Sequence, residues 1–164
     1  MKFKFRFRED FAAVRFGATL NRRTTQMEIF FDHEKLDAYQ RALDFAEWSE
    51  AVLKRVPKGI AVHGQLDRAR TSIVLNIAEG NGRFTAGDRC KFFDISRGSG
   101  LEPAACIDLL FIKKLLSTTE VVEGKSNLRD IVCLLIGLIR SNSPTRLHEQ
   151  PADYLTAPKS QSQS

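Results

Sequence analysis

Residues 65–83 read QLDRARTSIVLNIAEGNGR, and this stretch decides the fold. Apolar side chains recur there at the spacing of one helical face, at Leu66, Ala69, Ile73 and Ile77. Polar side chains follow a second face, at Gln65, Ser72, Asn76 and Glu79. Gly80 and Gly82 then end the pattern, because glycine readily adopts the left-handed conformation of a helix C-cap. The pattern predicts a helix packed in a bundle, with a polar stripe beside its apolar face.

Three further stretches have helical periodicity, so four helices are expected in all. They cover about 32–56, 60–80, 85–111 and 126–140. Asp32 is a suitable N-cap for the first, which ends before Pro57, and Thr85 with Asp88 suits the start of the third. No alternating β pattern competes over residues 32–142. We therefore predict an all-α protein, an antiparallel up-down four-helix bundle.

Two places in this pattern are irregular. The third helix contains Gly100 and Pro103, which predict a bend near Gly100, or a break there with Pro103 in the first turn of the next segment. The segment 117–126 is polar and contains a glycine, so we expect a link there, after which Ser126 or Asn127 caps the fourth helix.

The positive charge lies at the N-terminus. The chain has 25 Lys and Arg against 20 Asp and Glu, a net charge of +5. Residues 1–26 hold seven basic and two acidic residues, which gives 7 − 2 = +5, so residues 27–164 are neutral with 18 of each sign. Net charge therefore gives no reason to assign the body a polyanionic partner.

Three regions are expected. In residues 1–26 phenylalanine alternates at first with basic residues, and we expect a poorly ordered extension or a protein that starts at Met27; a basic arm that touches RNA or lipid head groups is the alternative. Residues 27–142 form the bundle. Residues 143–164 are rich in Ser, Gln and Pro and are expected to be a disordered polar tail.

Composition favours a cytoplasmic protein without a membrane span. The longest apolar run, residues 131–139, is nine residues long, whereas a span needs about 20. The N-terminus lacks the apolar stretch of a signal peptide. Three cysteines make an odd count without metal-type spacing, and we expect buried free thiols at Cys90, Cys106 and Cys133.

The polar stripe has two interpretations. Ser99 and Glu102 share a face of the third helix, and packing against the stripe would bring Glu79 and Glu102 together in the interior, as a catalytic or metal-binding pair. Di-metal bundles, however, use Glu-x-x-His pairs, and none of the three histidines has that spacing. We therefore expect no catalytic residue, metal or cofactor, and a structural network that fixes helix register, formed by Gln65, Ser72, Asn76, Glu79, Ser99 and Glu102.

Two surfaces are candidates for contacts with partners. The glycine turn at residues 80–83 lacks the Lys-Ser/Thr of a P-loop, but arginines near it are candidates for nucleic-acid contact, namely Arg68, Arg70, Arg83 and Arg89. Solvated charges are the alternative. The first helix has a second apolar stripe, predicted to cover a neighbouring subunit or to lie under the N-terminal segment, with Phe45, Trp48 and Val52.

The stretch quoted first also carries a resemblance. Its core, Asn-Ile-Ala-Glu-Gly-x-Gly-Arg at residues 76–83, is followed by Phe92-x-x-Ile95-Ser96-Arg97-Gly98-Ser99 and then by Glu102. Over residues 30–140 the chain resembles the bacterial four-helix-bundle family linked to intervening sequences within large-subunit ribosomal RNA genes. Gly100 and Pro103 depart from the family's pattern and affect only the expected straightness of the third helix.

The resemblance implies an up-down bundle that assembles into homo-oligomers, commonly pentamers, and implies no catalysis. The family's genetic context suggests association with RNA or the ribosome, and structurally similar accessory proteins of diversity-generating retroelements bind a reverse transcriptase and nucleic acid. The expected function is that of a non-enzymatic accessory protein associated with RNA or a ribonucleoprotein. The alternative is a protein-interaction scaffold that partners a reverse transcriptase through the outer face of the first helix.

Overall fold

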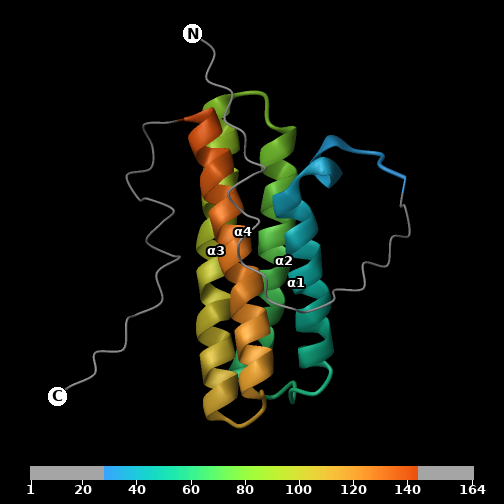
Figure 1. Ribbon diagram of the computed structural model, residues 1–164, viewed down its shortest axis with the longest axis vertical. Coiled ribbons are helices and arrows are strands. Elements are labelled where there is room, and N and C mark those ends of the chain that lie inside the picture. The colour runs from blue at the N-terminus through green and yellow to red at the C-terminus, as the bar shows by residue number, and fades with distance from the viewer. Residues whose placement is uncertain (1–27, 144–164) are drawn as a thin grey trace, which may run out of the picture.

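The structure, a computed structural model, describes residues 28–143. Its elements in chain order are η1 (Asp32–Lys35), α1 (Asp37–Leu53), α2 (Ala61–Gly82), α3 (Ala86–Ile112) and α4 (Thr118–Asn142). Each long helix packs against the next, and α4 packs back against α1, with the connections at alternate ends of the molecule (Figure 1). The prediction of an all-α antiparallel up-down four-helix bundle is confirmed.

The core takes side chains from all four long helices. The predicted apolar face of α2 is buried along its whole length, at Leu66, Ala69, Ile73 and Ile77. Opposite it, α1 contributes Phe45, α3 contributes Phe93 and Ile107, and α4 contributes Leu135, all without exposed surface or nearly so. Burial of a side chain of this size stabilises the fold by about 1.5–3 kcal/mol. The bundle is therefore held by one continuous apolar core.

The predictions for residues 1–26 and for the tail concern parts of the chain outside the described residues, apart from Ser143. Between residues 28 and 143, none of the helices combines the length and the apolar composition that a membrane span requires.

The prediction that Asp32 caps the first long helix is wrong. Asp32 lies in the 3-10 turn η1, where it pairs with the lysine that ends the turn, and α1 starts at Asp37. Glu34 instead stabilises the start of η1. Its carboxylate accepts hydrogen bonds from the backbone N–H groups of Phe31 and Phe30, at 3.0 and 2.7 Å, and these bonds lower the pKa of the carboxyl.

The prediction of a polar link over residues 117–126 is also wrong, because α4 begins at Thr118. Ser117 and Glu120 form a capping box there. The Ser117 hydroxyl accepts the Glu120 N–H at 3.3 Å, and the Glu120 carboxylate accepts the Ser117 N–H at 2.8 Å, which lowers the pKa of Glu120. Gly124, which suggested a turn, therefore lies within a helix.

Gly124 is a point of close approach between helices. A Cβ atom added to it would lie 2.6 Å from Cζ2 of Trp48, on α1, and 2.9 Å from Cδ1 of Ile107, on α3. The indole ring of Trp48 thus lies directly on the α4 backbone. Any side chain at this position would push α1 away from α4.

Gly124→Ala is expected to lower the free energy of unfolding by up to about 2 kcal/mol. Overpacking costs about 1–3 kcal/mol, and the gain of about 1 kcal/mol in helix propensity offsets only part of a cost near the upper end of that range, which the close contacts at this site favour. Urea denaturation measures the change. Gly137→Ala, in the same helix, is the matched control, because an added Cβ meets nothing within 4 Å there, and it is expected to stabilise. Stabilisation by both substitutions would contradict the described contact with Trp48.

The third helix is continuous, so of the two alternatives predicted near Gly100 the break is wrong, while the bend stays a prediction. α3 runs from Ala86 to Ile112 with Pro103 inside it. Gly100 is buried, and its added Cβ would lie 3.3 Å from Cγ2 of Val132 on α4. Proline inside a helix costs about 3 kcal/mol, and burial of Pro103 together with packing against α4 offsets that cost.

The predicted start of α3 is confirmed. Thr85 is its N-cap, and the Thr85 hydroxyl accepts a hydrogen bond from the Asp88 N–H at 3.1 Å. The turn between α2 and α3 is therefore short, and Thr85 caps the start of α3. A short turn makes the two helices antiparallel neighbours.

Candidate nucleic-acid and partner surfaces

Three members of the predicted polar network meet at the contact between α2 and α3. The hydroxyls of Ser72 and Ser99 lie 2.9 Å apart, and Asn76 Nδ2 donates to the Ser72 carbonyl at 2.7 Å and to its hydroxyl at 3.1 Å. Ser96, fully buried beside them, donates to the carbonyl of Ile73 at 3.0 Å. The Ser72–Ser99 and Ser96–Ile73 bonds join α2 to α3, whereas the bonds of Asn76 lie within α2 and hold Ser72 in place.

The other three members lie apart from this group. Gln65 accepts a hydrogen bond from Arg68 one turn further on. Glu79 pairs with Arg83, and Glu102 is exposed. The interpretation that Glu79 and Glu102 form a pair of carboxylates in the interior is therefore wrong, because both face solvent.

Ser96 was not among the predicted network residues, although the sequence contains a signal for it. It occupies a position in the buried stripe of α3, between Phe93 and Gly100 at helical spacing. A hydroxyl on an otherwise apolar face must find a partner, and the nearest one is a carbonyl of the neighbouring helix. Small polar residues inside an apolar stripe thus mark helix contacts.

The described residues contain no cluster of three His, Cys, Asp or Glu side chains arranged to hold a metal ion. The cysteines are free, and Cys90 and Cys106 are buried while Cys133 is half-buried. Burial raises the pKa of the Cys106 and Cys133 thiols, so neither is present as a reactive thiolate at neutral pH.

Arg70 does not face a ligand, which corrects one of the nucleic-acid predictions. Its guanidinium pairs with Asp67 at 2.6 Å and with Glu50 of α1 at 2.7 Å, and it donates to the Ala46 carbonyl at 3.2 Å. All these partners lie on α1 and α2. Arg70 therefore joins the first two helices and has no free face for a phosphate.

The other three arginines differ in the partners that their guanidinium groups have within the bundle. Arg83 pairs with Glu79, and its guanidinium carbon lies 4.6 Å from the ring centroid of Phe92. Arg89 donates to the backbone and side-chain oxygens of Asn81, both at 3.3 Å, while its buried Nε has no partner among the described residues. Arg68 is exposed and bonds only to the neutral Gln65.

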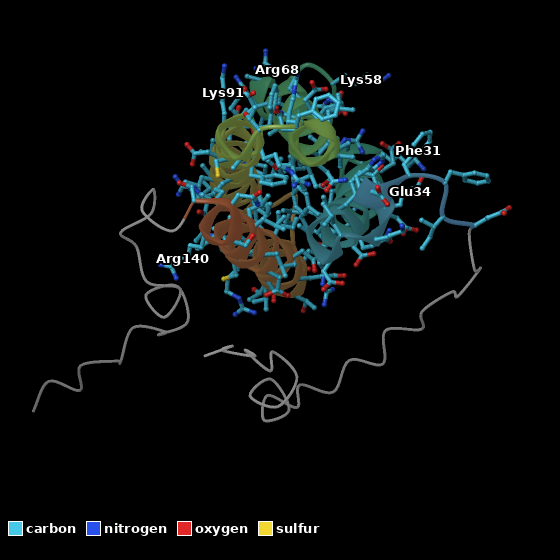
Figure 2. All side chains as sticks on the ribbon, turned by 90° about the horizontal axis from the view of Figure 1, so that it is seen from above. Phe31, Glu34, Lys58, Arg68, Lys91 and Arg140 are labelled. Carbon is cyan, nitrogen blue, oxygen red and sulfur yellow. The ribbon has the colours of Figure 1, made fainter. Side chains whose placement is uncertain are left out.

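Three exposed cations point outward on one side when the bundle is viewed along its length, away from Phe31 and Glu34, namely Lys58, Arg68 and Lys91 (Figure 2). Lys58 lies just before α2, Arg68 on α2 and Lys91 near the start of α3, so they are spread from one end of the bundle to the other. Lys58 and Lys91 have no carboxylate partner within residues 28–143. We call Lys58, Arg68 and Lys91 the cationic face.

The neutral body consists of two parts of opposite net charge. Residues 28–53, which include α1, have two basic and seven acidic side chains, 2 − 7 = −5. Residues 54–143 have 14 basic and nine acidic side chains, 14 − 9 = +5. The zero sum therefore conceals an acidic first helix and a basic remainder of the bundle.

The predicted subunit interface lies inside the protomer, which corrects that prediction. Phe45 has 0% of its surface exposed and Val52 is buried. Trp48, half-buried, stacks on Phe45 with ring centroids 5.6 Å apart and covers Gly124 of α4. The stripe that contains these residues faces the core, and neither a second subunit nor the N-terminal segment is needed to cover it.

The exposed apolar side chains of α3 form a different surface. They lie on its outward side together with one residue of α4, and they comprise Ile95, Leu101, Leu109, Ile112 and Val122. We call these five residues the outer apolar stripe. An exposed apolar stripe of this kind is typical of a surface that contacts another protein.

The model of the family described as 23S rRNA-intervening sequence protein matches residues 34–137. The chain belongs to this family. The match covers all of α1, α2 and α3 and most of α4, so the 23S rRNA-intervening sequence family is defined by the bundle itself. The resemblance stated from the sequence is thereby confirmed.

A solved structure supports the same fold. The chain is similar to a protein with unknown function from the S23 ribosomal protein family of Bacteroides thetaiotaomicron, with a TM-score of 0.59 and 22% identity over 63% of this chain and 98% of that chain. At this identity the likeness shows the fold. No curated protein matches the chain.

Proposed function

We propose that this member of the 23S rRNA-intervening sequence family is a cytoplasmic, non-catalytic, self-associating accessory protein that contacts RNA through its cationic face. The observation that carries the proposal is that three exposed cations without carboxylate partners point outward on one side along the length of the bundle, opposite in charge to α1. Lys and Arg side chains that neutralise phosphates dominate the affinity of proteins for nucleic acids.

The end of the cationic face near the α2–α3 turn supports contact with unpaired bases. Phe84 is fully exposed there, beside Arg83, whose guanidinium rests on Phe92. An exposed aromatic ring next to cations offers a stacking surface for a base. The family takes its name from 23S ribosomal RNA, and the similar solved structure belongs to a ribosomal protein family, which agrees with an RNA partner.

Two further observations support the non-catalytic and cytoplasmic parts of the proposal. Burial raises the pKa of the Cys106 and Cys133 thiols, and the carboxylates first considered as a catalytic pair are exposed. Three free thiols in one chain are typical of a reducing compartment.

Salt dependence tests the RNA partner. The affinity for a fluorescent RNA hairpin, measured by anisotropy at several salt concentrations, is expected to fall with a slope of about −0.7 to −0.9 in log–log form for each phosphate contact. Four contacts would give a slope of about −3. An affinity that does not change with salt, or no binding at low salt, would contradict the proposal and favour the protein-interaction scaffold, since an apolar docking surface is insensitive to salt.

Self-association is supported by the outer apolar stripe. Leu101→Asp with Leu109→Asp is expected to reduce the assembly to protomers, because a buried, unpaired carboxylate costs several kcal/mol at an apolar interface. Light scattering measures the mass. Leu43→Asp with Leu75→Asp, exposed leucines on α1 and α2, is the control and is expected to leave the mass unchanged. A wild-type protein that is strictly monomeric would refute this part of the proposal.

A further inference from the structure

A shallow groove runs along α2 on the outside of the bundle, with α1 beside one part of it and η1 beside the other. Two hollows of about 220 and 530 Å³ meet at Leu75 and form this groove. Leu43 and Leu75, 40% and 61% exposed, are its largest apolar side chains, and the larger hollow is also lined by His33 and Glu79. Its two ends are marked by Arg70 and Arg83, which are about 20 Å apart along α2.

The described chain begins beside one end of this groove. η1 packs against α2, and His33 lines the larger hollow together with Arg83. Just before η1, the side chains of Ile29, Phe30 and Phe31 are exposed. Figure 1 shows η1 next to the start of α1 and the end of α2, with the described residues before it leading away from the helices. A segment that precedes Glu28 therefore starts a few residues from the end of the groove at which η1 lies.

The preceding segment and the first part of the bundle are complementary in charge. Residues 1–26 carry +5, and residues 28–53 carry −5. On α1, Glu47 lies one turn after Leu43 on the same side of the helix, is exposed and has no partner among residues 28–143. α1 thus offers a carboxylate near the groove that the bundle itself does not neutralise.

The pattern of residues 2–8 fits both properties of the site. In the sequence KFKFRFR, the rings of Phe3, Phe5 and Phe7 alternate with basic side chains, so an extended strand presents rings on one side and cations on the other. Six extended residues span about 20 Å, the length of the groove, at about 3.3 Å per residue. The 20 residues between Phe7 and Glu28 reach up to about 60 Å, which leaves ample length for the return.

We propose that residues 1–26 dock into the groove along α2 of their own chain. The phenylalanine rings contact Leu43 and Leu75, and the basic side chains face Glu47 of α1. This goes beyond the proposed function, since the occupant of the groove is a segment of the protein itself and not RNA; the groove adjoins the cationic face at Arg83. It also assigns the charge of the arm to a partner within the protein rather than to a polyanion.

Zero-length carbodiimide cross-linking of the full chain tests the proposal, because it joins amines only to carboxylates in direct contact. Mass spectrometry of a mixture of unlabelled and ¹⁵N-labelled protein separates bonds within one chain from bonds between chains. Cross-links from Lys2 or Lys4 to Glu47 are expected, each within one isotope. Cross-links of mixed isotope would assign the groove to the arm of a second copy and overturn the proposal.

Leu75→Glu places a carboxylate in the middle of the groove. It is expected to reduce the yield of these cross-links about tenfold, because the phenylalanine rings then lie against a charge. Phe111→Glu, at an apolar residue of α3 that is 46% exposed and lies outside the outer apolar stripe, is the control and is expected to retain the yield. Circular dichroism checks that both variants are folded. Cross-links that survive Leu75→Glu, or that spread evenly over all faces of the bundle, overturn the proposal.

Discussion

Phe45→Ala is expected to lower the free energy of unfolding by about 3–5 kcal/mol, the range measured for large aromatic deletions in cores. Phe45 is completely buried in the middle of α1 and stacks on Trp48, so its removal leaves a cavity that the surrounding helices fill only in part. A domain of this size has a total stability of about 5–15 kcal/mol. The variant therefore loses a large share of it, and urea denaturation followed by circular dichroism measures the loss.

Leu43→Ala is the control, because Leu43 lies two positions earlier on the same helix but is exposed. It is expected to change stability by less than about 0.5 kcal/mol. A Phe45→Ala variant that keeps its stability but forms smaller assemblies would contradict the burial of Phe45 in the core. It would support the alternative that Phe45 contacts a neighbouring subunit.

Replacing Lys58, Arg68 and Lys91 together with glutamine is expected to weaken RNA binding about 100-fold at 0.1 M salt. Each lost phosphate contact removes about 0.7 from the slope of log affinity against log salt, so three contacts remove about 2 over the decade between 0.1 and 1 M. Anisotropy titrations of the wild-type protein and the variant measure both the affinity and the slope. Because all three side chains point into solvent, the fold is expected to remain intact.

The control variant replaces Lys35, Arg41 and Arg129 with glutamine. It removes the same net charge from η1, α1 and α4, away from the cationic face. RNA affinity is expected to change by no more than a few-fold. If both triple variants lost affinity equally, binding would depend on net charge alone and the cationic face would not be the contact surface.

The four helices and the buried face of α2 could be predicted from the sequence because both depend on local periodicity. The start of α4 and the continuity of α3 could not. Gly124 and Gly100 looked like helix breakers, since glycine has poor helix propensity. In the bundle each is a place where a neighbouring helix fills the space of a missing side chain. Whether a glycine breaks a helix or permits close packing depends on a partner that lies far away in the sequence.

The polar network was predicted in part, for a related reason. Spacing alone put Ser72 and Asn76 on one face, and the contact with Ser99 followed from the antiparallel arrangement of α2 and α3. Glu79, on the same helical stripe, lies about one turn further along and is exposed, although Ile77 and Gly80 on either side of it in the sequence are buried. Helical spacing gives the direction of a side chain around the axis. It does not say how far along the axis the neighbouring helix continues to cover it.

The prediction that Phe45, Trp48 and Val52 contact a neighbouring subunit was wrong because α1 has two apolar faces of similar length, and spacing alone does not show which one faces the core. The face with Phe45 and Val52 is buried, while the face with Leu43 is half-exposed. Charge was misjudged in a similar way, since the sum over the body is zero although its two parts carry −5 and +5. In both cases a property of the sequence does not show which side of the bundle a residue faces. Apolar spacing does not distinguish the two faces of α1, and a summed charge does not distinguish two regions of opposite sign.

The contact of Trp48 with Gly124 gives the protein an intrinsic optical reporter. Trp48 is the only tryptophan, and its ring lies where α1, the first long helix, meets α4, the last. Its emission therefore reports on the one helix contact that closes the bundle into a ring, rather than on contacts between helices that follow each other in the chain. A stopped-flow refolding trace of Trp48 follows the longest loop closure of the fold without any added label.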